Sequence, residues 1–512
     1  MADVIKIKKG LNIRMSGEAA KEFAPSAQSK CMGFDPSDFH GLVPKPALKV
    51  GDEVKVGTVL FYDKRIPELK VVSPVSGKLT AVNRGDRRKI LDFVVENDFK
   101  GEKAAVKPFD GTSAETAKQS LADAGMLVFF KQRPYDVVVN PADAPRAVFV
   151  STFDKAPLAP DMDFILVKEL SELQAGIDAV SKIAPVYVGV EKNSALNGRL
   201  KNAVVSAFDG PYPASNVGVQ INHVAPISKG EIVWTITPQE LVMIGRYAMR
   251  GVLDFSKVIA YTGVGASTPA YYRVLQGSPV AAITEANVAR GGDFRIIAGN
   301  PLSGFKTSGS SWLNPYVSQI TVLPEGDHAD ELLGWIMPRF SKFSVAGSFL
   351  SGMMPACLRD KIKFDFDTRV LGGERHMIMS GEYDRVFPMD IYPEQLVKSI
   401  IAFDIDKMEA LGIYEVVPED FAAAEFVCSS KMELQKIVRD GLDAMRLEMC
   451  YLIRNFKTSD NECTEKIARQ NEADLLRRGQ IVDVPFRLRR IRNVPVRPEQ
   501  HFPVRCPYSR CQ

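Results

Sequence analysis

The sequence predicts a multidomain α/β protein, and three observations support this fold class. With 512 residues, the chain is long enough for three or four domains. Near the N-terminus, short valine-rich runs alternate with glycine turns, a pattern typical of small β-domains. In the middle of the chain, apolar runs flank a segment with apolar residues at helical spacing, which indicates a parallel β-α-β layer. The composition, 46% hydrophobic and 25% charged, is that of a folded protein.

Residues 1–100 are predicted to contain a small flattened barrel. Residues 49–60 (K-V-G-D-E-V-K-V-G-T-V-L) and 71–82 (V-V-S-P-V-S-G-K-L-T-A-V) have the pattern of short strands joined by tight turns. This pattern resembles the barrel-sandwich hybrid fold of lipoyl and biotinyl carrier domains. In such carriers a lysine at a hairpin tip is modified, and Lys64 occupies that position here. Its neighbours depart from both the M-K-M and the T-D-K-A patterns, so an unmodified scaffold is favoured over a carrier.

Residues 101–255 are predicted to form a Rossmann-like α/β domain. Segments 147–152 and 164–168 have the composition of buried strands. The periodicity over 169–183 predicts a helix, which is followed by another strand at 186–190. Strand, helix and strand in this order favour a parallel layer.

Two features of this domain bear on function. The loop after the strand at 147–152 contains no glycine, which argues against a dinucleotide site, because close approach of a pyrophosphate needs glycines. Residues 208–223 are dense in Pro, Gly and Asn and are predicted to form an ordered loop, followed by a helix over 238–250. In that loop, His223 is either a structural residue, which we favour, or a ligand or proton donor.

The next two parts of the chain have different patterns. Residues 256–330 contain strand-like runs separated by glycine turns, among them V-A-A-I-T-E-A at 280–286, and are predicted to form a small mixed β unit. Residues 331–450 form a mixed C-terminal domain, with helical periodicity over 394–403 and 432–445.

Six segments, in this order and at these separations, resemble one protein family. They are I-K-I-K-K-G-L (5–11), K-V-G-D-E-V-K-V-G-T-V-L-F-Y-D-K (49–64), F-D-G-P-Y-P-A-S (208–215), G-W-I-M-P-R-F-S-K-F-S-V (334–345), G-E-Y-D-R-V-F-P-M-D (381–390) and E-F-V-C-S-S-K (425–431). The family is the A subunit of the bacterial sodium-translocating NADH:quinone reductase (Na+-NQR), and the resemblance extends to about Cys450. The C subunit of the Rnf-type electron-transport complex and the NADH-binding subunit of complex I are more distantly similar. They imply a β-grasp soluble-ligand-binding domain at 256–330 and a helical C-terminal domain.

The resemblance implies a peripheral subunit on the cytoplasmic side of the bacterial inner membrane. The six-subunit complex, a translocase, oxidises NADH, reduces ubiquinone or menaquinone, and exports Na+. This subunit would take part in quinone binding and would hold no flavin, Fe–S cluster, metal or catalytic residue of its own. A four-iron cluster needs four thiolates, and residues 425–450 contain only Cys428 and Cys450. No apolar run approaches the roughly 18–20 residues of a membrane-spanning helix, and the opening nine residues lack the apolar core of a signal peptide.

A quinone site needs an apolar slot for the ring and one or two donors for its carbonyl oxygens. The family resemblance places quinone contacts near two loops that offer aromatic rings, hydrogen-bond donors and a glycine. The predicted quinone-binding residues are Phe39, His40, Gly41, Leu42, Arg133 and Tyr135. The alternatives are a docking subunit with no tight small-molecule site, or a carrier modified on Lys64.

The net charge of +3 has two unequal sources. Residues 1–450 carry −3, and residues 451–512 carry +6. The basic tail at 451–512 is either a functional segment for anionic lipid or nucleic acid, or an extraneous and poorly ordered extension. The second interpretation is favoured because the resemblance ends before this tail. The mildly acidic body excludes a general nucleic-acid clamp, so no nucleic-acid partner is predicted.

Overall fold

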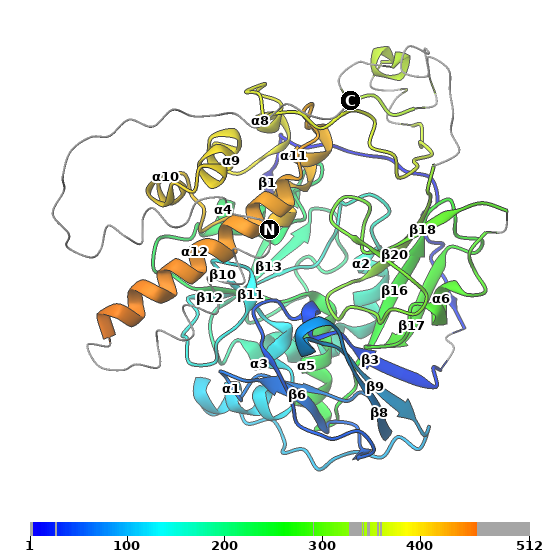
Figure 1. Ribbon diagram of the computed structural model, residues 1–512, viewed down its shortest axis with the longest axis vertical. Coiled ribbons are helices and arrows are strands. Elements are labelled where there is room, and N and C mark those ends of the chain that lie inside the picture. Colours follow the sequence, from blue (N-terminus) through cyan, green and yellow to red (C-terminus); the bar gives the residue numbers. More distant parts are fainter. Residues whose placement is uncertain are drawn as a thin grey trace. The chain divides into compact units, whose positions relative to one another are not determined.

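The structure, a computed structural model, describes residues 4–25, 28–289, 291–326, 340, 342–345, 349–355, 358 and 361–457 (Figure 1). The chain divides into two compact units, Met1–Asp443 and Ala444–Gln512. Their boundary falls inside helix α12 (Leu434–Lys457). The predicted tail at 451–512 therefore begins within that helix, and residues 458–512 lie outside the described residues, as do residues 334–339 of the family-like segment.

The N-terminal barrel consists of two small sheets, one with the strand order β3-β9-β8-β5 and the other with the order β4-β6-β7. The strands are β3 (Cys31–Phe34), β4 (Pro44–Pro46), β5 (Glu53–Val54), β6 (Val59–Asp63), β7 (Lys70–Val72), β8 (Gly77–Arg84) and β9 (Ile90–Asn97). Phe61 of β6 stacks on Phe93 of β9 with ring centroids 4.6 Å apart, so the two sheets share one core. The exposed Lys64 lies at the tip of the β6–β7 hairpin.

The second domain is built on a sheet of seven described strands in the order β1-β14-β13-β12-β15-β10-β11. They are β1 (Val4–Lys6), β10 (Lys131–Arg133), β11 (Val137–Val138), β12 (Ala147–Ser151), β13 (Val186–Glu191), β14 (Val204–Asp209) and β15 (Val233–Thr235). The pairs from β1 to β15 are parallel, whereas β10 is antiparallel to both neighbours. Strand β12 lies between β13 and β15 in the sheet. From β12 the chain adds β13 and then β14 on one side, and only then β15 on the other side, so the strand order reverses between β12 and β15.

Helices cover both faces of this sheet, as the alternation along β12 shows. Val148 and Val150 belong to the core cluster shared with α3 and α5, whereas Ala147 and Phe149 belong to a cluster shared with α4. The helices of this domain are α1 (Ala114–Asp123), α2 (Met162–Leu166), α3 (Leu170–Val180), α4 (Val217–Val224) and α5 (Pro238–Arg250).

Helices α3 and α5 approach each other closely through two glycines. A Cβ atom on Gly245 of α5 would lie 1.8 Å from the Glu172 carbonyl oxygen, and one on Gly176 of α3 would lie 2.1 Å from the Leu241 carbonyl oxygen. Any larger residue would therefore force the two backbones apart.

The helices predicted over 169–183 and 238–250 are confirmed as α3 and α5, but two other predictions in this domain are wrong. Segment 164–168 is not a strand: α2 covers its first three residues, and Asp161 caps that helix by accepting from the Phe164 N–H at 3.0 Å. A five-residue apolar run has no period that separates a buried strand from a buried helix.

The predicted loop at 208–223 is also wrong over its second half, where α4 begins at Val217. The turn-forming residues are concentrated before Val217, and the apolar residues that follow form the buried side of the helix. His223 therefore lies on α4, with Nδ1 2.9 Å from the Val219 carbonyl oxygen of the same helix.

The third domain contains a mixed sheet in the order β19-β18-β20-β16-β17-β2, as predicted for residues 256–330. Its strands are β2 (Phe23–Ala24), β16 (Ser256–Thr262), β17 (Ala270–Leu275), β18 (Phe294–Ala298), β19 (Phe305–Thr307) and β20 (Gln319–Pro324). The strand expected at 280–286 is wrong, because a short helix, α6 (Ala281–Thr284), forms there. Its two alanines favour a helix over a strand.

The N-terminal segment contributes to two sheets besides the barrel. Strand β1 pairs with β14 at one edge of the second domain's sheet, and β2 pairs with β17 at one edge of the third domain's sheet. Both strands precede the barrel in the sequence.

The remaining described residues are mainly helical, which confirms the helices predicted near 394–403 and 432–445. The elements are α8 (Tyr383–Val386), α9 (Pro393–Ile401), α10 (Ile405–Ala410), the 3-10 turn η6 (Pro418–Phe421), α11 (Ala422–Val427) and α12. Within the described part of the chain, every helix is too short or too polar to cross a bilayer.

Candidate functional site

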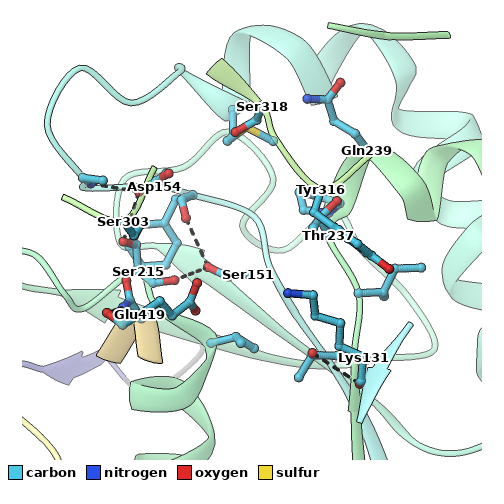
Figure 2. Close-up of a pocket in the computed structure, with 18 of the residues that line it drawn as sticks. Lys131, Ser151, Asp154, Ser215, Thr237, Gln239, Ser303, Tyr316, Ser318 and Glu419 are labelled. Atoms are coloured by element: carbon cyan, nitrogen blue, oxygen red, sulfur yellow. Dashed lines mark hydrogen bonds between the residues drawn. The ribbon is translucent and has the colours of Figure 1, made fainter. Parts of the chain in front are cut away.

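A cavity of about 250 Å³ lies at the carboxyl ends of β12 and β15 (Figure 2). Ser151 ends β12 and Thr235 ends β15, and both line the cavity, together with the first residues of α4 and α5. In a parallel α/β sheet, a crevice opens outside the strand ends where the strand order reverses. The cavity lies at that reversal, so its position follows from the topology.

The walls of the cavity are partly apolar and come from several elements. Phe129, Phe153 and Tyr316 contribute aromatic rings, and Met162 and Ile236 add aliphatic surface. An apolar cavity of about 150 Å³ holds benzene, so this volume suits one six-membered ring with substituents.

Some polar groups around the cavity are hydrogen-bonded to described residues, and others are not. The Ser151 hydroxyl contacts the carbonyl oxygens of Phe153 at 3.1 Å and Ser215 at 2.8 Å. By contrast, no hydrogen bond joins the hydroxyls of Thr237 and Ser318 to any residue that the structure describes. These two hydroxyls are therefore available as donors to a bound molecule.

Two carboxyl groups in the cavity hold protons more strongly than usual. Burial raises the pKa of Asp154, although the Ala156 N–H opposes this effect. Burial and then the neighbouring Asp420 carboxyl raise the pKa of Glu419 to about 7, against the opposing charges of Arg133 and Lys131. Near neutral pH, Glu419 is therefore present in both its protonated and its ionised form.

The structure brings the two predicted loops together. The Val138 N–H donates to the His40 carbonyl oxygen at 3.0 Å. His40 Nε2 lies 2.8 Å from Asp443 Oδ1, which also accepts from Arg439 Nη2 at 3.0 Å. Arg439 Nη2 in turn donates to the Tyr135 carbonyl oxygen. Side chains near the start of α12 therefore connect His40 to Tyr135.

Asp136 joins this loop pair to the cavity, which it lines. Its carboxylate lies 3.6 Å from Lys131 Nζ and 3.7 Å from Arg439 Nη1. Burial acts to raise the pKa of Asp136, but Lys131 and then Arg439 outweigh burial and hold the pKa below its usual value.

Two of the predicted residues have side chains that are already engaged. Phe39 is buried, and its ring meets that of Tyr316 edge-on at 6.1 Å, so it supports a wall of the cavity. Arg133 lines the cavity, but Nη1 donates to the Glu415 carbonyl oxygen at 2.9 Å and to the buried Asp420 carboxylate at 3.3 Å.

The other two predicted residues shape the first loop. Gly41 has a φ of +88°, a conformation that glycine adopts readily, and its carbonyl oxygen accepts from Arg65. The Leu42 N–H donates to the Phe39 carbonyl oxygen at 3.0 Å. Both residues are half-buried.

Sequence reasoning missed Lys131, Thr237, Ser318 and Glu419. Thr237 was open to prediction, because it directly precedes the predicted helix at 238–250 and follows a strand. No local pattern marked Glu419, which reaches the cavity from η6 through the tertiary fold.

The described residues contain no group of three His, Cys, Asp or Glu side chains placed to hold a metal ion. Cys428 is buried, with Sγ 2.9 Å from the Tyr383 hydroxyl. The described part of the structure thus contains a ring-sized cavity, and its Cys428 thiol is engaged by a tyrosine.

Known proteins match the chain along most of its length. Family models match the NqrA N-terminal barrel-sandwich hybrid domain at residues 5–98, the NqrA second alpha/beta domain at 112–253, and the NQRA C-terminal domain at 258–309. The A subunit of the Na(+)-translocating NADH-quinone reductase of Hahella chejuensis is 33% identical over 456 residues, which cover 87% of this chain and 100% of the relative. The corresponding subunits of Alcanivorax borkumensis and Pasteurella multocida are each 32% identical with the same coverage. The chain belongs to this NqrA family.

The NqrA matches coincide with the observed architecture. The first covers the barrel and the second covers most of the seven-stranded sheet, which confirms the predicted barrel-sandwich hybrid and α/β domains. Among solved structures, the NAD+-reducing [NiFe]-hydrogenase in its H2-reduced state has a TM-score of 0.31 and 12% identity over 62% of both chains. A similarity this weak carries no argument about an NqrA-family chain.

Proposed function

We propose that this chain is the peripheral, cytoplasmic-side subunit of a six-subunit membrane complex that passes electrons from NADH to ubiquinone or menaquinone and exports Na+. In this proposal its own part is to bind the quinone, and it holds no flavin, Fe–S cluster or metal. The names of the relatives supply NADH, quinone and sodium as the chemistry of their complexes. We also assign the Rossmann-like and β-grasp folds to the second and third domains, which the parallel order of the second domain's sheet and the mixed order of the third's support.

The observation that carries quinone binding is the ring-sized cavity beside the two predicted loops. Aromatic walls suit a quinone ring, and the Lys131 ammonium and the Thr237 and Ser318 hydroxyls suit its two carbonyl oxygens. His40 and Tyr135 are connected to this cavity through Arg439, Asp443 and the cavity-lining Asp136. The His40 side chain is 39% exposed and lies outside the cavity lining, so it would meet a ligand that extends beyond the cavity toward this loop.

Two substitutions at the loops test this proposal. We expect His40→Ala and Tyr135→Phe each to weaken binding of a short-chain ubiquinone about five-fold, since a hydrogen bond contributes about 1 kcal/mol. The measurement is a calorimetric titration of the purified chain. Lys192→Ala is the matched control, because Lys192 forms an exposed ion pair with Asp209 and does not line the cavity, and its affinity should be unchanged.

The titration also separates the alternatives. No saturable binding by the unsubstituted chain would favour a docking subunit without a quinone site. Wild-type affinity in both variants would remove His40 and Tyr135 from the site. If the unsubstituted chain and the Lys192 variant bind quinone with full affinity while both loop variants bind it more weakly, the result would support a quinone beside these loops.

A further inference from the structure

Glu419 differs from the other acids of the cavity because its carboxyl is unengaged among the described residues. Asp154 accepts from the Ala156 N–H at 2.8 Å, and Asp136 pairs with Lys131 and Arg439. The Glu419 carboxyl has no hydrogen bond to any described side chain or backbone group. The residue lines the cavity and keeps part of its surface open to solvent, while the surrounding protein atoms and the Asp420 carboxyl still raise its pKa. An unengaged carboxyl inside a ligand-sized cavity is available to the ligand itself.

We infer that Glu419 is the acid that protonates a quinone oxygen in this cavity during reduction. The inference rests on the proposed quinone function and adds a catalytic residue to it. Figure 2 shows the Lys131 side chain extending toward the side of the cavity where Glu419, Ser151 and Ser215 lie. The Lys131 charge acts on the Glu419 carboxyl, so a quinone ring held between the two side chains would have one oxygen near the ammonium and the other near the carboxyl.

The charges around Glu419 keep it able to both give and regain a proton. Asp420 faces it from the same turn, η6, and Lys131, Arg133 and Asp136 face it from β10 and the loop that follows. Burial and Asp420 favour the protonated form, whereas the two cations oppose it. An acid with a pKa near the working pH is the most effective proton donor.

In the proposed step the quinone gains two electrons and two protons. Two electrons from NADH reach the quinone through the complex and leave negative charge on its oxygens. One oxygen takes the Glu419 proton, so an O–H bond forms on the ring as the carboxyl O–H bond breaks. Two protons are taken from the aqueous medium: one restores the Glu419 acid and the other adds to the second oxygen, so the quinone, two electrons and two protons give the quinol. The Lys131 ammonium stabilises the negative charge that reduction leaves on the other oxygen.

The test uses the assembled complex carrying Glu419→Gln, which cannot donate an acidic proton but preserves the side chain's size. We expect kcat for quinone reduction to fall at least 100-fold, in the range of a lost general acid, with the quinone Kd changed less than about three-fold. In the unsubstituted complex, kcat should fall as the pH rises through about 7, since the protonated form is then lost, and this step should vanish in the variant. NADH oxidation by ferricyanide, which bypasses the quinone, should be unaffected.

Two further variants keep the result interpretable. Glu415→Gln removes a nearby acid that bonds to Asn222 and does not line the cavity, and it should keep both the rate and the pH step. Glu419→Asp retains an acid on a shorter side chain, and it should lower kcat about ten-fold while keeping a pH step. If Glu419→Gln fails to assemble, an unchanged kcat in Glu419→Asp would overturn the inference.

The outcomes distinguish this inference from the proposed function. A Glu419→Gln complex that binds quinone normally and keeps the wild-type rate and pH profile would overturn the proton-donor role and leave quinone binding intact. An unsubstituted complex in which this chain binds no quinone would overturn the proposed function itself. A pH-independent, slow variant with normal affinity would support both.

Discussion

The Lys257→Met substitution is expected to lower the free energy of unfolding by about 3–5 kcal/mol, the cost of leaving one partner of a buried ion pair alone. Lys257 Nζ donates to Glu240 Oε1 at 2.8 Å, and the two side chains are only 3% and 0% exposed. The other Glu240 oxygen has no hydrogen-bond partner among the described residues. The lysine is therefore the main compensation for a carboxylate held away from water.

Denaturant unfolding of the purified chain measures this loss, and two variants serve as controls. Lys192→Met breaks an exposed pair, in which Lys192 and Asp209 are 45% and 44% exposed, and should cost no more than about 1 kcal/mol. The double variant Lys257→Met with Glu240→Leu removes both charges and should recover most of the loss. A Lys257→Met variant as stable as the Lys192→Met variant would contradict the expectation.

The second large effect is expected from Gly245→Ala, at about 3 kcal/mol of lost stability. Alanine favours a helix over glycine by about 1 kcal/mol, so propensity alone predicts a gain. The added Cβ would lie 1.8 Å from the Glu172 carbonyl oxygen, however, and backbone atoms cannot move aside as a flexible side chain can. Because the first residues of α5 line the cavity, separating α3 from α5 should also weaken the quinone binding proposed above.

Thermal unfolding and the quinone titration, applied to the same preparation, check both parts of this prediction. Gly373→Ala is the matched control: a Cβ there has no atom within 4 Å, so stability should change by less than about 0.5 kcal/mol. A Gly245→Ala chain that melts at or above the temperature of the unsubstituted chain would show that α3 and α5 can separate at little cost.

The sequence predicted the elements with long or well-bounded patterns. The helix at 238–250 matched α5 at both ends because Pro238 can start a helix and Gly251 ends it at a φ of +62°. The segments at 164–168 and 280–286 failed because each is too short to show a period. The structure of short elements was decided by capping and tertiary packing, which the local pattern does not contain.

Only part of the candidate site could be predicted from the sequence. The family resemblance pointed to both loops, and the structure places them side by side, but of the six predicted residues only Arg133 lines the cavity. The cavity follows from the reversal of strand order, which needs the full topology and not the order of elements alone. Glu419 entered the site through a long-range contact, so no motif around it could have identified it.

The pairing of β1 with β14 and of β2 with β17 has a consequence for the protein's synthesis. The ribosome makes both edge strands first, yet their partners end only at Asp209 and Leu275. Strands β1 and β2 must remain unpaired with those sheets while the barrel and much of the second domain emerge. A fragment that begins at residue 101 would have exposed edges on both sheets, which favours aggregation. The domains follow one another along the chain, but each of the two later sheets contains a strand from the N-terminal segment. The later domains should therefore not be expressed without that segment.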